Sequence, residues 1–541
     1  MSPTTTPTGR KRPAARVAFV GTGPGDPRLL TLAAVEALAA ADAIVTDQLT
    51  ALDVVRSHAC PDAEIVDASH GTPGQALTHA SRAKLVVATA KAHPGGLVVR
   101  LMDGDPATFN GLAEEAIACQ KAGIAFEIVP GVTAATAVPA YAGIPLTGAA
   151  VTGVHVLAPG QSGIEWAAYA DPATTVVLLG TAPDLETGAQ ALLAAGRDPK
   201  TLVALTEHGT TTRQRTQVCE LRVAARTVAG LGFPTLAILG PTVPMREHLS
   251  WFESKPLFGW RVLIPRTMDQ AQPVLGLLAG HGAHGEIVPT ISVEPPRTRH
   301  QMDKAIRGLV TGSYEWIGFT SVNAVKAVRE LFEEIGLDAR ALAGLKVAAV
   351  GGVTAEALRA WGIRPDLVPS GEASARGLVA EWPEYDADLD PINKVFLPRA
   401  DIATDTLVAG LEDLGWSVEA VTAYRTVRAA PPKPEVRESI KGGDFDAVVF
   451  TSSSTVRNLV GIAGKPHAST IVACIGPATA KTAEDHGLRV DVLAPEASVP
   501  VLIEALADFG RGRAAAALEA GEVLRRPSEK RRSTARRRAR S

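Results

Sequence analysis

The sequence predicts an α/β protein with more than one domain. Short runs of β-branched residues alternate with stretches rich in alanine and leucine, such as Val17–Val20 before Leu29–Ala41 and Val347–Val350 before Ala355–Trp361. This alternation is typical of βαβ units and parallel sheets. Glycine and proline cluster where expected strands turn into helices, which is where such sheets bind ligands. The 541 residues exceed what one hydrophobic core supports, so we expect about three to four domains.

The composition is that of an ordinary globular protein. Hydrophobic residues make up 46% and charged residues 21%, which excludes the disordered and fibrous classes. The four cysteines are scattered without a CxxC pair, which argues against a disulfide framework and against a zinc site, so we predict no metal. No secretory signal and no apolar run of ~18 residues is present. We therefore expect a cytoplasmic protein without a membrane partner.

Both ends of the chain are expected to be disordered. Residues 1–15 contain no apolar stretch. From Leu524 to Ser541 there are nine basic residues and one Glu, a concentration that the formal net charge of −3 conceals. A basic tail can contact nucleic acid, a membrane or an acidic partner, or simply be a solvated terminus. The body of the chain lacks the basic, aromatic-interleaved face of nucleic-acid modules, so we do not expect a nucleic-acid partner.

The character of the sequence changes around Pro241–Gly259, after which a new strand is expected at Trp260–Ile264. We place the boundary between two modules there. The first module spans 16–251 and is followed by a linker at 252–259. The second module spans 260–510 and is followed by a tail at 511–541.

The second module contains an internal repeat. Three segments return later in the module with similar residues: Phe319–Val325 as Phe450–Val456, Ile264–Thr267 as Leu397–Ala400, and Val350–Ala355 as Ile475–Ala480. The offsets of 125 to 133 residues are too long for a solenoid, whose periods run to ~20 to 50 residues. They predict two similar lobes.

A glycine-rich loop, Gly21–Pro27, follows the first expected strand of the first module. It does not match GxGxxG, and Pro24 removes a backbone donor that a dinucleotide loop would use. The loop alone is equally consistent with a tight strand-to-helix turn. Further motifs follow it in order at Val98–Leu101, Gly104–Pro106, Pro130–Ala135 and Pro139–Thr147.

Together these motifs resemble the uroporphyrinogen-III C-methyltransferase branch of the tetrapyrrole methylases, from about Ala15 to Trp251. The resemblance implies two α/β subdomains with S-adenosylmethionine in the cleft between them, and a homodimer formed through this module. It implies Asp47 as a candidate catalytic base. It also implies a set of cofactor-binding residues: Pro24, Gly104, Asp105, Thr108, Thr133, Ala134, Leu179 and Gly209.

Several positions depart from the family pattern. Ala68 stands where the family has a lysine, Asp103 replaces a glycine, and Leu179 replaces a methionine that borders the cofactor. Lost basic residues matter because a polycarboxylate substrate is recognised through them. Two interpretations stay open: an active methyltransferase, or a domain that is non-catalytic or altered in specificity.

The second module resembles uroporphyrinogen-III synthase from about Gly259 to Phe509, through the repeated motifs and Thr422–Thr426. The resemblance implies two flavodoxin-like lobes, lobe 1 at about 260–291 and 427–509 and lobe 2 at about 295–419. Ser292–Glu294 and Ala423–Arg425 would be the strands that cross between them. It implies no cofactor for this module.

The synthase-like motifs place hydroxyl groups and free N–H groups at helix N-termini, which are ready sites for carboxylates. Tyr424 aligns with a family tyrosine placed to assist the departing hydroxyl, although it could be a buried linker tyrosine. Thr-Ser before a helix is also an ordinary N-cap, and the two arginines below could form strand-end ion pairs. The candidate substrate-binding residues are Thr320, Ser321, Asn323, Gly351, Thr451, Ser452, Ser453, Gly476, Arg266 and Arg399.

The two resemblances imply a bifunctional enzyme. The synthase would cyclise hydroxymethylbilane with inversion of ring D and loss of water, and the methyltransferase would carry uroporphyrinogen III to precorrin-2. In the alternative, the second module is a synthase and the first module is a domain that is non-catalytic or altered in specificity. A third class, a non-enzymatic carboxylate-binding or nucleic-acid protein, is motivated only by the basic tail.

Overall fold

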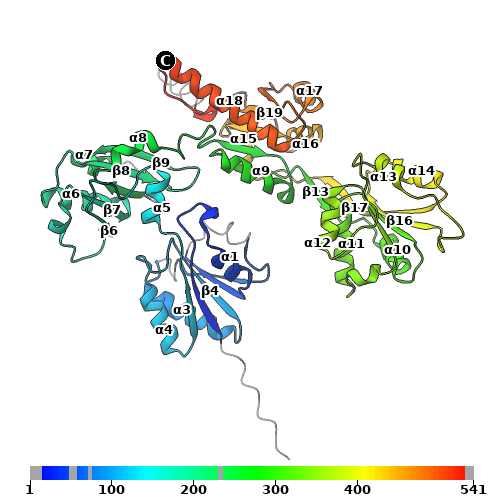
Figure 1. Ribbon diagram of the computed structural model, residues 1–541, viewed down its shortest axis with the longest axis horizontal. Helices are drawn as coiled ribbons and strands as arrows, with labels where there is room; N and C mark the ends of the chain where they lie inside the picture. The colour runs from blue at the N-terminus through cyan, green and yellow to red at the C-terminus, as the bar shows by residue number, and fades with distance from the viewer. Residues whose placement is uncertain (1–14, 48–57, 71–75, 229–234, 530–541) are drawn as a thin grey trace, which may run out of the picture. The chain divides into compact units, whose positions relative to one another are not determined.

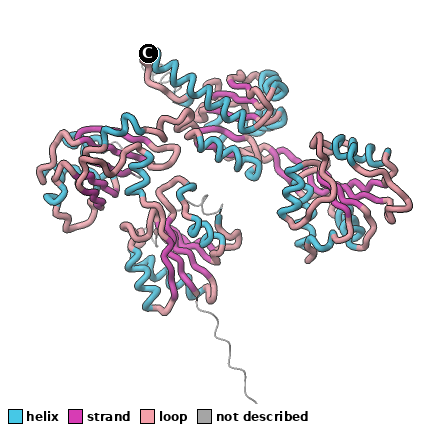
Figure 2. Tube along the Cα trace, viewed as in Figure 1, coloured by secondary structure: helices cyan, strands magenta, loops and turns pink. Residues whose placement is uncertain are grey.

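The computed structural model describes residues 15–47, 58–70, 76–228 and 235–529. The described chain forms two compact units. The first contains the residues up to Arg261 together with Leu275–Gly285 and Leu506–Arg526, and the second contains Val262–Val274, Glu286–Ala505 and the residues from Pro527. Figures 1 and 2 show helices and strands alternating throughout, so the predicted α/β class is confirmed.

The first subdomain is a parallel sheet in the order β3-β2-β4-β1-β5. Successive residues of a strand face opposite sides, so Val17 and Phe19 join one core and Ala18 and Val20 the other. Helix α1 covers one face, and α3 and α4 cover the other (Figure 1). The elements are β1 (Arg16–Gly21), α1 (Leu32–Ala39), β2 (Ala43–Thr46), β3 (Glu64–Asp67), α3 (His79–Ala92), β4 (Leu97–Met102), α4 (Leu112–Lys121) and β5 (Ala125–Val129).

The second subdomain is a mixed sheet in the order β6-β7-β10-β8-β9, in which only β6 and β7 pair in parallel. Helices α6 and α7 pack on one face, and α5 packs on the other. The elements are α5 (Ala134–Tyr141), β6 (Gly153–Leu157), β7 (Thr174–Gly180), α6 (Ala182–Ala194), β8 (Leu202–Glu207), β9 (Arg215–Glu220), α7 (Leu221–Val228), β10 (Thr235–Leu239) and α8 (Arg246–Leu249).

Lobe 1 of the second module has the strand order β12-β11-β18-β19-β20. Numbered along the chain this is 2-1-3-4-5, the flavodoxin-like order. The elements are β11 (Arg261–Ile264), α9 (Met268–Gly280), β12 (His284–Ile287), α15 (Pro434–Gly442), β18 (Ala447–Phe450), α16 (Ser453–Ala463), β19 (Ile471–Cys474), α17 (Pro477–Asp485), β20 (Val492–Leu493) and α18 (Val499–Glu519).

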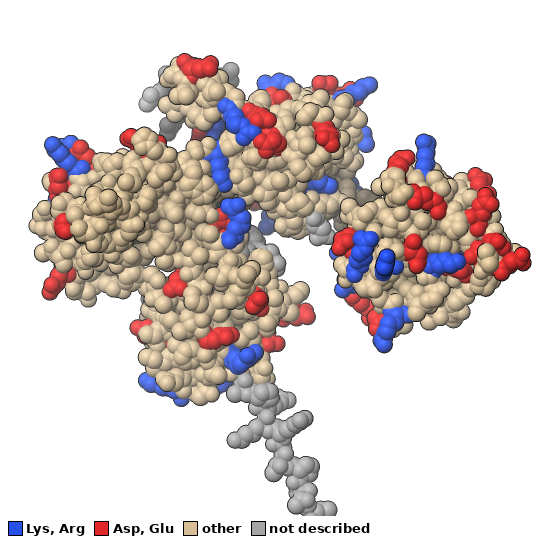
Figure 3. Space-filling view, viewed as in Figure 1, with Lys and Arg blue, Asp and Glu red and all other residues tan. Residues whose placement is uncertain are grey.

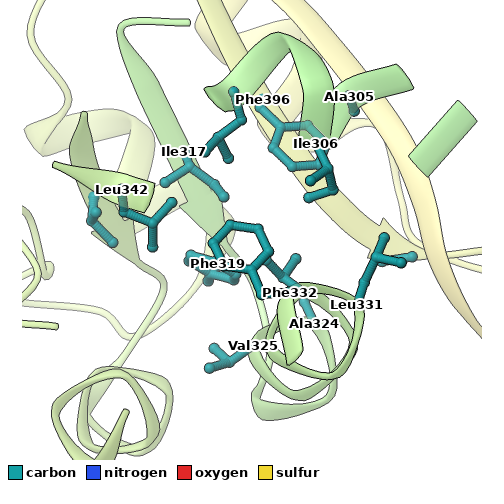
Figure 4. Close-up of a cluster of buried hydrophobic side chains, with 14 of the residues drawn as sticks. Ala305, Ile306, Ile317, Phe319, Ala324, Val325, Leu331, Phe332, Leu342 and Phe396 are labelled. Atoms are coloured by element: carbon teal, nitrogen blue, oxygen red, sulfur yellow. The ribbon is translucent and has the colours of Figure 1, made fainter. Parts of the chain in front are cut away.

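Lobe 2 has the strand order β13-β17-β16-β14-β15. Figure 4 shows its larger core, in which Phe319, Phe332 and Phe396 lie among aliphatic side chains from α10 and α11. The elements are β13 (Ile291–Glu294), α10 (His300–Val310), β14 (Trp316–Phe319), α11 (Val322–Glu334), β15 (Lys346–Ala349), α12 (Gly352–Ala360), α13 (Ala375–Glu381), β16 (Lys394–Ala400), α14 (Thr406–Asp413) and β17 (Ser417–Arg428).

The two lobes repeat one arrangement of strands. An isolated parallel bridge places Leu367 beside Ala348 of β15, so lobe 2 reads β17-β16-β14-β15-Leu367 where lobe 1 reads β12-β11-β18-β19-β20. The repeated phenylalanines, Phe319 and Phe450, end the matching strands β14 and β18. The chain therefore passes through the same layout twice in permuted order, and the prediction of two similar lobes is confirmed.

The lobes are connected through a short antiparallel strand pair. Residues 291–294 of β13 pair with residues 428–425 at the end of β17, and the Arg425 guanidinium contacts the Glu294 carboxylate at 2.7 Å. Tyr424 lies one residue before this pair and is matched instead with Ala400 of β16.

Two segments differ from the expected linker and tail. Phe252 and Leu257 are buried, so part of 252–259 belongs to a packed core. Helix α18 continues to Glu519 through the Ala514–Ala517 run, whose high helix propensity the basic composition obscured. The Arg526 guanidinium donates to the Gly259 carbonyl. The expected disorder at residues 1–14 and 530–541 lies outside the described residues.

Charges of both signs mix on the surface. Figure 3 shows lysine and arginine interspersed with aspartate and glutamate on the visible face. Over the part of the chain that the structure describes, none of the helices is long and apolar enough to span a bilayer.

Candidate active sites

Three glycines meet at the carboxyl ends of neighbouring strands in the first subdomain. Gly21 ends β1, and Gly104 and Gly131 follow the adjacent strands β4 and β5. A Cβ added to Gly21 would stand 2.5 Å from the Gly104 carbonyl oxygen and 2.6 Å from the Gly131 Cα. Gly23 and Gly104 also exchange two backbone hydrogen bonds at 3.1 Å. Such close backbone approach leaves no room for side chains.

Asp105 joins two of these loops. One carboxylate oxygen accepts from the Ala107 N–H at 2.9 Å and the Thr108 hydroxyl at 3.2 Å, and the other accepts from the Gly131 N–H at 3.0 Å. Thr133 then caps α5 by accepting from the Ala135 N–H at 3.3 Å.

The N-terminus of α5 lies close to the backbone of Gly104. Gly104 has a φ of +59°, and a Cβ there would stand 3.6 Å from the Ala134 nitrogen and 3.7 Å from the Thr133 Cα. The absence of a side chain therefore leaves the helix N-terminus open on that side. Free N-terminal N–H groups suit a carboxylate such as that of an amino acid.

The glycine-rich loop that carries Pro24 is fastened to the loop that carries Gly209. The Asp26 N–H donates to the Thr210 hydroxyl at 3.0 Å, and the Tyr141 hydroxyl donates to the Asp26 carboxylate at 2.9 Å. His208 and Thr210 adopt φ values of +48° and +64°, which are strained for residues with side chains.

Burial alone would raise the pKa of Asp26, but hydrogen bonds from Arg28 and Tyr141 outweigh it and hold this pKa below its ordinary value. Burial and the Asp26 carboxylate raise the pKa of Tyr141 to about 12. Leu179, the remaining cofactor candidate, lies on β7 beside Leu236 and packs into the core under α5.

Asp47 belongs to a network of charges. Its carboxylate contacts the guanidinium groups of Arg100 at 3.2 Å and Arg82 at 3.3 Å. Arg100 is buried inside β4 and also binds the buried Glu115 of α4 at 2.8 Å. Arg82 donates to the carbonyl of Ala68, the position at which the family has its lysine.

Arg82, Arg100 and Glu115 were not among the residues predicted from the sequence. The sequence did contain an indication of this charge network. Arg100 interrupts an otherwise apolar strand, and Glu115 falls on the inward side of its helix. Buried charges in such positions need partners.

In the synthase module, the repeated serines begin equivalent helices. Ser321 caps α11 with φ and ψ of −163° and 158°, and Ser452 caps α16 with −166° and 159°. Their hydroxyl oxygens accept from the Ala324 and Thr455 N–H groups at 3.1 and 3.3 Å.

The repeated glycines behave in the same way. Gly351 caps α12 with φ and ψ of −176° and 173°, and Gly476 caps α17 with −175° and 173°. Each lobe therefore presents two helix N-termini that follow neighbouring parallel strands, where free N–H groups can bind carboxylates.

The other substrate-site candidates lie around these caps. Thr320, Asn323 and Thr451 are partly exposed at the helix starts, and the Ser453 hydroxyl donates to the Ala478 carbonyl at 3.0 Å. Arg399 pairs with Asp405 at 2.8 Å, the strand-end ion pair that the sequence left open. Burial lowers the pKa of Arg266, and among the described side chains no carboxylate pairs with it.

Tyr424 is the one tyrosine that the structure brings to these caps. Its side chain is buried on β17, and its hydroxyl oxygen lies 2.9 Å from the Ser321 hydroxyl oxygen. The two residues are separated by 103 positions in the sequence, so their contact depends on the fold of lobe 2.

Comparisons with known proteins match both modules. Residues 16–225 match the family model described as tetrapyrrole (corrin/porphyrin) methylases, and residues 273–504 match the model of uroporphyrinogen-III synthase HemD. Over 514 residues the chain is 30% identical to "Porphyrin biosynthesis protein HemD" of Ruminiclostridium josui, covering 92% of this chain and 98% of that protein.

Other similar proteins match less than half of the chain. The "Siroheme synthase" of Psychromonas ingrahamii is 38% identical over 248 residues, covering 44% of this chain and 51% of that protein, so this chain spans about half of its length. The crystal structure of a uroporphyrin III C-methyltransferase from Thermus thermophilus is 32% identical, with a TM-score of 0.37, and covers 42% of this chain and 99% of that chain.

The resemblances seen in the sequence are thus confirmed along nearly the whole chain. The first module is an S-adenosylmethionine-dependent methyltransferase module, and the second is a synthase module. The chain belongs to the family of fused proteins that join a tetrapyrrole methylase to a uroporphyrinogen-III synthase.

Proposed function

We propose that the two modules catalyse consecutive steps on one tetrapyrrole. The synthase module closes hydroxymethylbilane with inversion of ring D, and the methyltransferase module methylates the resulting uroporphyrinogen III toward precorrin-2. The observation that carries the proposal is the pairing of two matched sets of helix N-termini with one tyrosine, Tyr424, in a chain that also keeps the glycine loops of a methylase.

The synthase step needs binding and direction more than strong acid or base chemistry. The hydroxymethyl C–O bond breaks with its electron pair on oxygen, and Tyr424 donates the proton that lets it leave as water. The substituted carbon of the last pyrrole then attacks the azafulvene. Rearrangement of the spiro intermediate closes the ring, and the proton released on rearomatisation returns to the tyrosine oxygen.

Substrate orientation comes from carboxylate binding. Acetate and propionate groups would meet the N-termini capped by Ser321, Gly351, Ser452 and Gly476, with Thr320, Asn323, Thr451 and Ser453 beside them. Arg266 is the better placed cation for this role, because Arg399 is already bound to Asp405. Holding reacting groups in the productive geometry can lower a reaction barrier by up to about 7–11 kcal/mol.

In the methyltransferase module, S-adenosylmethionine would supply an electrophilic methyl group to a nucleophilic pyrrole carbon. The residues that would hold it are those gathered at the three converging loops and α5: Pro24, Gly104, Asp105, Thr108, Thr133, Ala134, Leu179 and Gly209. Asp47, held by Arg82 and Arg100, would accept a proton near the substrate.

Arg82 brings a cation to the place of the lost family lysine, which favours an active domain over a degenerate one. The loss of the lysine at Ala68 removes a cation, but Arg82 brings another to the carbonyl of that same residue. Its guanidinium already pairs with Asp47, so it would bind a substrate carboxylate only when that pair opens. Asp103 and Leu179 remain departures that a domain with altered specificity would also show.

Each half of the proposal has its own assay. Freshly made hydroxymethylbilane without cofactor should give the type III isomer, whereas the type I isomer alone would contradict the synthase assignment. Uroporphyrinogen III with labelled S-adenosylmethionine should give a methylated product. Binding of S-adenosylhomocysteine without methyl transfer would instead support the non-catalytic alternative.

Two further expectations belong with the proposal. We propose a homodimer formed through the methyltransferase module, on the strength of the family resemblance, which light scattering would test. We also propose a cytoplasmic location, supported by four cysteines that are all free in the described structure.

A further inference from the structure

The two capping serines of the synthase module have different partners, although their helices begin alike. The Ser321 oxygen accepts from the Ala324 N–H and lies 2.9 Å from the Tyr424 hydroxyl. The Ser452 oxygen accepts from the Thr455 N–H and lies 2.9 Å from the Ser454 hydroxyl. The duplication therefore provides an internal comparison: the same cap with and without a phenol.

Counted from the repeated prolines, the sequence position that matches Tyr424 is Ile291, an aliphatic residue at the start of β13. Ile291 follows Pro265 by the same number of residues as Tyr424 follows Pro398. The neighbouring Thr290 is buried and donates its hydroxyl to the Pro265 carbonyl at 3.2 Å. The sequence between Trp260 and Ile291 and between Val427 and Phe509 contains no tyrosine at all.

We propose that Ser321 is a positioning residue for Tyr424, and that lobe 2 accordingly takes the hydroxymethyl end of the bilane while lobe 1 binds only carboxylates. This inference rests on the proposed synthase function and adds a direction to substrate binding. The two lobes share an architecture, but only lobe 2 provides the proposed acid, Tyr424.

Both side chains of the Ser321–Tyr424 contact are held in place by their surroundings. Capping fixes the Ser321 side chain, because its oxygen must face the Ala324 N–H. Tyr424 is fixed by its place on β17 beside Ala400 and by burial, with 7% of the residue exposed. Movement of Ser321 would break its cap hydrogen bond, and movement of Tyr424 would expose a buried side chain.

The hydrogen bond also suits proton donation. The backbone N–H occupies one lone pair of the Ser321 oxygen and leaves the serine O–H free to turn toward Tyr424. When the phenol gives its proton to the leaving hydroxyl, the serine O–H can donate to the phenolate oxygen, and hydrogen bonds to a charged acceptor are about twice as strong as neutral ones. In lobe 1, Ser452 and Ser454 offer only two aliphatic hydroxyls.

A double-mutant cycle on the full chain tests this inference. The variants are S321G, Y424F and the double variant, with formation of type III isomer as the readout. Glycine is a good N-cap, so S321G removes the hydroxyl at little cost to the helix. We expect each single change to lower kcat by about tenfold with KM nearly constant, and the double variant to fall no further.

Two comparisons separate positioning from capping. S452G removes the equivalent hydroxyl in lobe 1, and we expect it to raise KM more than it lowers kcat. S321T restores a hydroxyl and should recover most of the kcat. Equal kcat losses in S321G and S452G would overturn the inference, as would single-variant effects that multiply in the double variant.

The failure of this inference is distinguishable from the failure of the proposed function. If the unmodified protein makes only type I isomer, the synthase assignment itself is wrong. If it makes type III isomer and the cycle shows independent effects, only the Ser321 role and the substrate direction are lost.

Discussion

Arg100 and Glu115 form an ion pair at 2.8 Å with both side chains buried, at 1% and 0% exposure. The Arg100 guanidinium also contacts Asp47, so one buried cation links a core carboxylate to the candidate catalytic one. Taking such charges out of water is costly, and their arrangement persists only because each has a partner. The pair therefore connects the packing of the first subdomain to the position of Asp47.

Removing one partner of this pair should be strongly destabilising. Glu115→Ala leaves the Arg100 charge buried without its main partner, and breaking a buried pair typically costs about 3–5 kcal/mol. Urea unfolding of the first module would measure it. Glu220→Ala is the matched control in the same module, since the Arg222–Glu220 pair is exposed and should contribute no more than ~1 kcal/mol. Similar losses in both variants would contradict a buried role.

Gly104→Ala should weaken cofactor binding beyond its effect on the backbone. The new methyl group would enter the space in front of the Ala134 nitrogen. Gly123→Ala is the control, because Gly123 also has a positive φ, +72°, but has nothing within 4 Å of an added Cβ. Calorimetry with S-adenosylhomocysteine should show at least a tenfold loss of affinity for the first variant. Equal affinities would place the cofactor elsewhere.

The stability of the first module should fall at acidic pH partly through Asp26. Because the pKa of Asp26 is lower in the folded protein than its ordinary value of 3.8, the stabilisation is complete above about pH 4 and is lost as pH falls through the folded pKa. Asp26→Asn should cost stability at neutral pH and flatten this acid-side decline. An unchanged slope between neutral pH and about pH 3 would refute the assignment.

The two strand-end arginines of the synthase module should differ in their effects on substrate binding. Arg266→Ala should raise KM for hydroxymethylbilane by about tenfold, the size of one charge-assisted contact. Arg399→Ala should have a smaller effect, since that guanidinium already binds Asp405. Steady-state kinetics at low and high salt would test both. A larger change for Arg399 would mean that its ion pair opens to receive substrate.

Most of the fold could be predicted from local sequence patterns. Strand and helix rhythm, the turn glycines and the repeated Phe-Thr-Ser segments depend on neighbouring residues, so the two modules and the two lobes could be predicted from sequence. The end of α18 could not, because basic residues near the terminus suggested a tail while Ala514–Ala517 favour a helix. The basic composition predicted a disordered tail there, whereas the helix propensity of the alanines predicted a helix.

Contacts between distant residues were beyond sequence reasoning. The Arg82–Asp47 and Arg100–Glu115 pairs, the Asp26–Tyr141 bond and the Ser321–Tyr424 contact each join different elements. The left-handed backbone conformation of His208 and Thr210 could not be predicted either, because neither residue type favours a positive φ. The sequence could identify the loops of both sites but not which side chains hold them in place.

One chain is proposed to close the bilane and then to methylate the product. Both steps can be followed in a single incubation of the full-length protein with freshly made hydroxymethylbilane and labelled S-adenosylmethionine. We expect a labelled, methylated product built on the type III isomer. Unlabelled type III isomer would contradict the methyltransferase half, and type I isomer alone would contradict the synthase on which the sequence of reactions depends.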